Sequence, residues 1–168
     1  MSEYVEITFG KYKGKSLEQI AVSDYPYFKW LKGIILSDRI RESIEELEYK
    51  LNHYVPQLSC AASGCSKTAE FMSVVATRFG VSVGPAYVGC AEHIEQIRSM
   101  HPKAIYYPIK YDSLLQIFSG KPTRADLQEL LDFLLLTTGW ERKRRRTKRA
   151  MKEHFDNLKL MGEQLRLF

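Results

Sequence analysis

Residues 9–31, FGKYKGKSLEQIAVSDYPYFKWL, decide the fold of the N-terminal region. Two glycines permit a tight chain reversal. Ser16 then precedes a helical pattern with Gln19 three positions later, which is typical of a capping box. Asp24 stands before a second helical stretch that ends near Gly33. The segment therefore predicts a turn followed by two short helices.

The flanking elements complete a predicted helical module over residues 1–52. A short strand is expected before the segment, at Tyr4–Phe9, and Ser37 is expected to cap a third helix after it. Apolar residues recur in that helix at spacings of four, three and four, which predicts one face packed against a core: Ile40, Ile44, Leu47 and Leu51.

Residues 53–109 are expected to form an α+β region. Helices are predicted over Ser66–Phe79, where apolar side chains share one face, and over Glu92–Met100. Val81–Val88 and Ala104–Ile109 have strand-like composition, and a proline in each limits them to short or edge strands.

Residues 110–160 are expected to be helical, and residues 161–168 form a tail. Helices are predicted at Tyr111–Phe118, from Thr123 to about Gly139 with a leucine-rich face, and at Trp140–Leu160.

The composition indicates a globular protein, since 45% of the 168 residues are hydrophobic and 12% are aromatic. The longest apolar stretch, Leu130–Leu136, contains Asp132 and is far too short to span a bilayer. The first residues lack the basic and apolar parts of a signal peptide. We therefore expect a cytoplasmic protein with no membrane partner.

Three cysteines and a histidine form two short-spaced pairs. Cys60 and Cys65 are separated by four residues, Cys90 and His93 by two, and 24 residues lie between the pairs. This spacing is typical of a structural zinc site, in which a Cys3His set closes a tetrahedron. Independent buried thiols are the alternative. Two other histidines are alternatives for the fourth ligand: His53 and His101. The predicted fold class is mainly α with a small zinc-supported α+β region.

The net charge of +5 is concentrated in one stripe. Residues 141–152, ERKRRRTKRAMK, hold eight Lys or Arg and one Glu, a local charge of +7, which leaves −2 for the rest of the chain. Such a stripe predicts binding to a nucleic-acid backbone, because neutralising phosphates releases counterions. The alternatives are a solvated helix and a membrane surface. Sequence-independent DNA contacts are predicted for Arg142, Lys143, Arg144, Arg145, Arg146, Lys148, Arg149 and Lys152.

The N-terminal segment resembles the C-terminal domain of exodeoxyribonuclease X-like proteins over about residues 5–35. In that family a Phe-Gly-Lys turn, a Gly-Lys-Ser/Thr-Leu helix start and an aspartate-tyrosine-tryptophan-leucine helix recur in this order. The motifs that match are Phe9-Gly10-Lys11, Gly14-Lys15-Ser16-Leu17 and the helix from Asp24 to Leu31. We do not expect the nuclease half, which needs clustered acidic residues and would lie ahead of Phe9.

The lysines of this turn are candidates for phosphate contacts, and solvated turn lysines are the alternative. The three are Lys11, Lys13 and Lys15. The aromatic residues are expected to be core residues instead: Phe9, Tyr12 and Trp30.

The last five residues, Gln164-Leu165-Arg166-Leu167-Phe168, resemble the sliding-clamp-binding peptide of bacterial polymerases and repair proteins, whose core is Gln-Leu-Ser/Asp-Leu-Phe. Gln164, Leu165, Leu167 and Phe168 match this pattern, and Arg166 departs from it. The resemblance implies docking on a clamp; a C-terminus that folds back onto the core is the alternative.

These features predict a non-catalytic DNA-binding accessory protein of bacterial or phage DNA replication or repair, recruited to the sliding clamp. No complete catalytic constellation is present in the sequence. Two alternatives remain open: a phage-type regulator that occupies the clamp pocket, and a zinc enzyme acting on nucleic acid.

Overall fold

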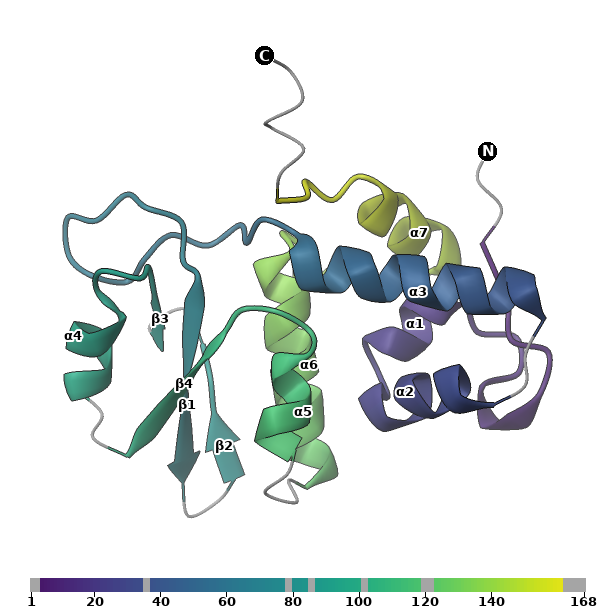
Figure 1. Cartoon of the computed structure of the whole chain (residues 1–168), viewed down its shortest axis with the longest axis horizontal. Helices are drawn as coiled ribbons and strands as arrows, with labels where there is room; N and C mark the ends of the chain where they lie inside the picture. The colour runs from purple at the N-terminus through teal and green to yellow at the C-terminus, as the bar shows by residue number, and fades with distance from the viewer. Residues whose placement is uncertain are drawn as a thin grey trace. The chain divides into compact units, whose positions relative to one another are not determined.

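The computed structural model describes residues 4–34, 37–77, 80–84, 87–100, 103–118 and 123–161. The chain divides into two compact units (Figure 1): unit 1 combines Met1–Val55 with Lys143–Phe168, and unit 2 is Pro56–Arg142. This division differs from the four consecutive regions expected from the sequence, because a helix near the C-terminus packs with the N-terminal helices.

Unit 1 is helical. A 3₁₀ turn at Gly10–Tyr12 leads into α1 (Leu17–Ala21), α2 (Tyr25–Gly33) and α3 (Asp38–His53), and α7 (Lys148–Asp156) returns from the other end of the chain. The short helix α1 contacts α2, α3 and α7, so it lies at the centre of the unit. The buried core includes Leu17, Ile20, Phe28, Leu31, Ile44, Leu47, Leu51, Met151 and Phe155.

The predicted helix starts of unit 1 are confirmed. The Ser16 side chain accepts from the N–H of Gln19, and the Gln19 side chain accepts in return from the N–H of Ser16. Asp24 accepts from the N–H of Tyr27 at the start of α2. Helix α3 begins directly after Ser37 as predicted, but the Ser37 side chain makes no cap hydrogen bond. These local bonds satisfy N–H groups that a helix terminus leaves without partners.

The strand expected at Tyr4–Phe9 is reduced to a single bridge between Glu6 and Ser16. That prediction was wrong in extent: backbone hydrogen bonds join Val5 and Ile7 to residues 14–17, but the pairing stops where the chain turns into α1.

The basic helix expected over Trp140–Leu160 is wrong in extent. It begins at Lys148, after Thr147, whose side chain accepts from the N–H of Ala150. Residues 142–146 are not helical, and like charges at helical spacing would oppose each other there. The helix α7 also has an apolar face, which the sequence interpretation missed, since Met151 and Phe155 are buried.

Unit 2 contains a small antiparallel sheet around β1 (Phe71–Thr77). One edge of β1 pairs with β4 (Ala104–Pro108), and the other edge pairs with β3 (Val88–Gly89) near its start and β2 (Gly80–Ser82) near its end. In Figure 1, helix α4 (Ile94–Ser99) lies on one side of this sheet, and α5 (Ser113–Phe118) and α6 (Arg124–Thr137) lie on the other.

The helix predicted over Ser66–Phe79 was wrong, because this segment contains the strand β1. The segment carries apolar residues at helical spacing, but Met72 and Val74 also alternate at the strand period, and both are buried. Its β-branched residues favour extended backbone, and pairing on both edges supplies the hydrogen bonds that a helix would have made. The short strands and the helices α4, α5 and α6 were predicted correctly in type, and Gly139, at φ 87°, ends the last of them.

The fold is therefore mainly α with a small β region, as predicted. Within the described ranges, no helix has both the length and the apolar character needed to cross a membrane.

Candidate functional site

The first two cysteines of the predicted ligand set lie on one closed loop of unit 2. The N–H of Cys60 donates to the Lys67 carbonyl at 2.8 Å, and the N–H of Cys65 donates to the Ala62 carbonyl at 3.1 Å. Gly64, at φ 76°, makes the turn between them. The backbone therefore folds this segment into a knuckle that brings two sulfur atoms to one side.

The second pair lies where β3 meets α4. The backbone N–H groups of His93 and Ile94 donate to the Cys90 carbonyl at 3.1 and 3.0 Å, which turns the chain into the helix. The N–H of Ala61 donates to the Val88 carbonyl at 3.0 Å, and so joins the first loop to the strand that ends at the second.

The structure brings all four predicted ligands together. The ligand atoms of Cys60, Cys65, Cys90 and His93 all lie within 4.8 Å of one another. The Cys65 and Cys90 sulfurs are 4.0 Å apart, and the His93 Nδ1 lies 3.3 Å from the Cys90 sulfur and 3.8 Å from the Cys60 sulfur. A zinc tetrahedron with bonds of about 2.0–2.3 Å has edges of about 3.5–3.8 Å, so these three separations are close to tetrahedral edges, and the set can hold a metal ion.

Backbone N–H groups around Cys60 lower the pKa of its thiol. Burial alone raises the pKa of this thiol, but hydrogen bonds from the backbone N–H groups of Cys90 and Ala62 bring it below its ordinary value. Cys60 and Cys90 are buried, packed with Ile97. A thiolate is the form in which cysteine binds metal ions.

The other histidines do not join this cluster in the described structure. His53 belongs to unit 1, where its ring stacks on Tyr49 with centroids 4.2 Å apart. His101 lies outside the described residues. Among the described residues, His93 is therefore the histidine that completes the set.

Gly89 holds the two halves of the cluster close. A Cβ atom at this position would lie 2.9 Å from the Ile97 Cδ1 and 3.0 Å from the Ile94 Cα. We predict that Gly89→Ala lowers the free energy of unfolding by about 1–3 kcal/mol, since α4 must move away from β3. Urea unfolding measures this. Gly84→Ala is the control, because its nearest contact would be Tyr87 at 4.0 Å; an equal loss in both variants would contradict the prediction.

The three lysines of the N-terminal turn have different environments. Lys11 forms an ion pair of 2.6 Å with Asp24, whereas Lys13 and Lys15 are exposed. Burial raises the pKa of Asp24, but hydrogen bonds from Lys11, the N–H of Tyr27 and the Tyr12 hydroxyl hold it below its ordinary value. The Lys11 charge is thus compensated within the fold.

The basic residues 142–152 also differ in whether an acidic side chain compensates their charge. Lys148 pairs with Glu6 at 2.6 Å, Arg149 with Glu153 at 2.8 Å and Lys152 with Asp156 at 2.6 Å. The residues before α7 are mostly exposed, and within the described ranges three of them have no ion pair: Arg142, Lys143 and Arg145. The segment before α7, rather than the helix, therefore presents the uncompensated charge.

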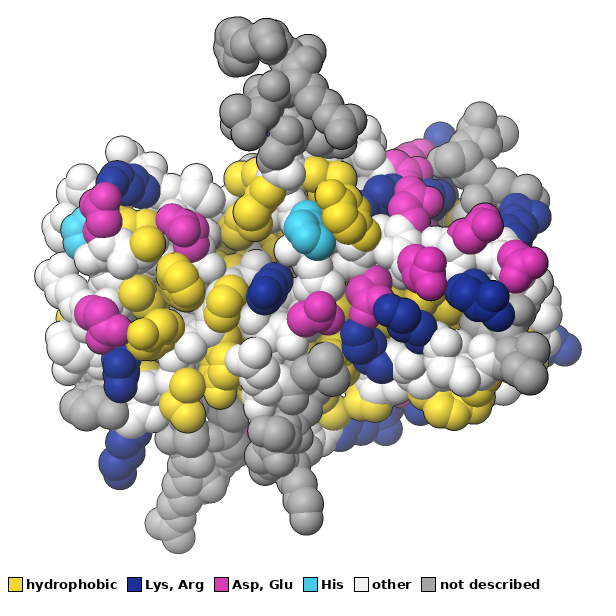
Figure 2. Space-filling model, in the orientation of Figure 1, with side chains coloured by type: hydrophobic (Ala, Val, Ile, Leu, Met, Phe, Trp, Pro, Cys, Tyr) yellow, Lys and Arg dark blue, Asp and Glu magenta, His cyan; other side chains and the backbone are white. Residues whose placement is uncertain are grey.

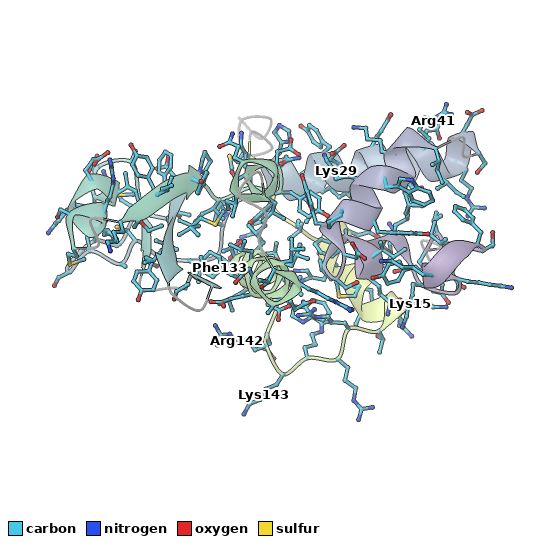
Figure 3. The ribbon with its side chains drawn as sticks, turned by 90° about the horizontal axis from the view of Figure 1, so that it is seen from below. Lys15, Lys29, Arg41, Phe133, Arg142 and Lys143 are labelled. Atoms are coloured by element: carbon cyan, nitrogen blue, oxygen red, sulfur yellow. The ribbon has the colours of Figure 1, made fainter. Side chains whose placement is uncertain are left out.

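Helix α1 joins the basic segment to the N-terminal turn. The Gln19 side chain, which caps α1, donates to the Arg146 carbonyl at 2.7 Å. Lys15 precedes the cap residue Ser16, so the capping box connects Lys15 to the segment that holds Lys143. In Figure 3, Lys15 and Lys143 lie toward one side of unit 1, and Arg41 lies toward the opposite side. We use the name basic surface for the exposed cations on these two linked segments that have no ion pair among the described residues: Lys13, Lys15, Lys143 and Arg145.

The face of unit 1 formed by α2 and α3 has a different character. Figure 2 shows basic and acidic side chains interleaved over α3. Glu48 binds both Lys29 and Lys32, and Lys50 binds Glu46 at 2.7 Å. This face is therefore close to neutral, and it serves as an internal comparison for the basic surface.

The clamp-peptide residues, Gln164, Leu165, Leu167 and Phe168, lie outside the described residues. The chain just before them is fixed to unit 1: Leu160 forms a bridge with Tyr54, and the N–H of Met161 donates to the His53 carbonyl at 2.6 Å.

Gln19 makes a tertiary contact that the sequence did not predict, since the sequence indicated only its role in the helix cap. Its second hydrogen bond reaches 127 residues along the chain, and no local pattern signals such a contact.

No protein-family model matches this chain, and neither the curated proteins nor the solved structures that were compared contain a match.

Proposed function

We propose that this chain is a non-catalytic DNA-binding accessory protein of bacterial or phage DNA replication or repair. One observation supports the DNA contact above the others: the Gln19–Arg146 hydrogen bond draws two exposed basic segments together in unit 1. Neither segment alone presents more than a few uncompensated charges. Together they offer several cations to successive phosphates, and such contacts bind backbone without reading sequence.

The second part of the proposal is recruitment. The C-terminal peptide is proposed to dock on a bacterial sliding clamp, with Leu167 and Phe168 as apolar anchors. Docking on a clamp raises the local concentration of the basic surface near DNA, so each contact can be weak.

The third part concerns the metal. We propose zinc at Cys60, Cys65, Cys90 and His93, because three thiols and an imidazole at tetrahedral spacing suit zinc. Four protein ligands fill the coordination sphere and leave no position for a reacting water, which supports a structural role.

The DNA contact is tested by removing charge from the basic surface. In fluorescence anisotropy with a labelled duplex at about 0.1 M salt, Lys15→Gln/Lys143→Gln is expected to bind roughly tenfold more weakly for each lysine that meets a phosphate.

The matched control removes two charges from α3, with Arg39→Gln/Arg41→Gln, which is expected to retain wild-type affinity. Equal losses in the two double variants would show that net charge, and not the basic surface, determines binding. Retention of affinity in both would contradict the proposed surface.

A further inference from the structure

An aromatic side chain lies exposed beside the N-terminal turn. Trp30 on α2 is 51% exposed, although the sequence predicted it to be a core residue. Its ring lies 5.0 Å from that of Tyr27, tilted by 41°, and the Tyr27 ring meets the Tyr12 ring edge-on at 4.9 Å. The three rings form a continuous row from the turn to α2, which we call the aromatic row.

The aromatic row is held in place by Lys11 and by the turn at Gly10. The Lys11 Nζ lies 5.0 Å from the centroid of the Tyr12 ring and 5.2 Å from that of Tyr27. At Gly10, a Cβ atom would lie 2.5 Å from the Tyr27 hydroxyl, so glycine lets the turn close over this ring. The rings are thus oriented before any ligand arrives, which lowers the entropic cost of binding to them.

Cations that can meet phosphates adjoin the aromatic row. Lys13 follows Tyr12 directly, and Lys13 and Lys15 are both exposed, with no acidic partner among the described residues. Two carboxylates described in this region are already paired: Asp24 with Lys11, with a further hydrogen bond from the Tyr12 hydroxyl at 2.9 Å, and Glu6, which lies opposite Ser16, with Lys148. The region therefore combines exposed π-faces with exposed positive charge.

We propose that the aromatic row binds single-stranded DNA, with a base stacked on Trp30 and the adjoining phosphates at Lys13 and Lys15. Stacking requires a base whose face is free. In a duplex both faces of each internal base are covered by neighbours, so the row can add affinity only for single strands. The proposal rests on the proposed DNA-binding function and specifies its substrate class.

Tryptophan fluorescence tests this directly, because the chain has two tryptophans and Trp140 is only 2% exposed. Oligothymidylate is expected to quench the emission of the full chain through Trp30. Quenching should persist in Trp140→Phe and disappear in Trp30→Tyr, which removes the reporter and keeps an aromatic ring. Binding of oligothymidylate without quenching would overturn the proposal.

Affinity provides the second readout. Trp30→Ala is expected to weaken binding of oligothymidylate by about tenfold, and to leave duplex affinity unchanged. Trp30→Tyr should restore most of the single-strand affinity. Tyr49→Ala is the control, since Tyr49 is 54% exposed on α3, where its ring stacks on His53.

The two proposals fail in different ways. Absence of binding to both duplex and single strand would contradict the DNA-binding function itself. Equal affinity for both, with no effect of Trp30→Ala, would overturn the single-strand proposal and leave DNA binding in place.

Discussion

Removal of the metal is expected to unfold unit 2 and leave the helices of unit 1 folded. The four proposed ligands come from the knuckle, from the end of β3 and from the start of α4, so the ion would hold these segments together. Without the ion, three thiol groups that bound it lie close together and no longer hold the segments in place. Zinc binding to structural sites has apparent free energies of about 10–16 kcal/mol at neutral pH in small domains, which exceeds the stability of most domains.

The measurement is metal content together with circular dichroism during chelation. About one zinc per chain is expected, and helical signal from unit 1 should remain after unit 2 has unfolded. His93→Ala should lose the metal, and His53→Ala, which changes a histidine of unit 1, should keep it. A chain that contains no metal and unfolds at the same temperature with and without chelator would contradict the metal site. A zinc enzyme would instead lose an activity on chelation while it stayed folded.

The second large effect is expected at the C-terminal peptide. Leu167→Ala/Phe168→Ala should weaken capture of a purified bacterial sliding clamp by about 100-fold or more, because buried apolar anchors each contribute about 2 kcal/mol or more in such pockets. The wild-type peptide is expected to bind with micromolar affinity, since an isolated tail must become ordered when it docks.

Arg166→Ala is the control for the tail, because this position departs from the clamp-binding pattern. It should retain clamp binding. Equal recovery of the clamp by wild type and by the double variant would sink the recruitment proposal. The regulator alternative differs in its dependence on DNA: a clamp inhibitor keeps its effect when Lys15 and Lys143 are neutralised, and an accessory protein does not.

Much of the local structure was predictable from the sequence. Ser16, Asp24 and Thr123 were identified as caps because capping depends on residues within one helical turn. The clustering of the three cysteines with His93 was predictable for a similar reason, since two short-spaced pairs with glycines nearly determine their own loops.

The errors arose where distant segments decide the outcome. β1 was predicted as a helix because its apolar pattern fits both periods, and pairing with β2, β3 and β4 selects the strand. The apolar face of helix α7 was missed because basic residues dominate its sequence, although Phe155 is buried.

The charges show the same limit. The sequence predicted phosphate contacts equally for all three lysines of the N-terminal turn. In the structure Lys11 is paired with Asp24, so it is less available for such a contact than the other two. The hydrogen bond from Gln19 to the Arg146 carbonyl joins the N-terminal turn region to the basic segment before α7. Both contacts depend on tertiary structure, and both determine where DNA is proposed to bind.

The most direct test of the proposed DNA-binding function is the salt dependence of duplex binding by the wild-type chain, measured on two unrelated sequences. Four cations of the basic surface that each meet a phosphate predict that log K falls with log salt with a slope of about −3 to −4. The slope and the affinity should be the same for both sequences. Absence of binding at low salt, or binding that does not change with salt, would contradict the account.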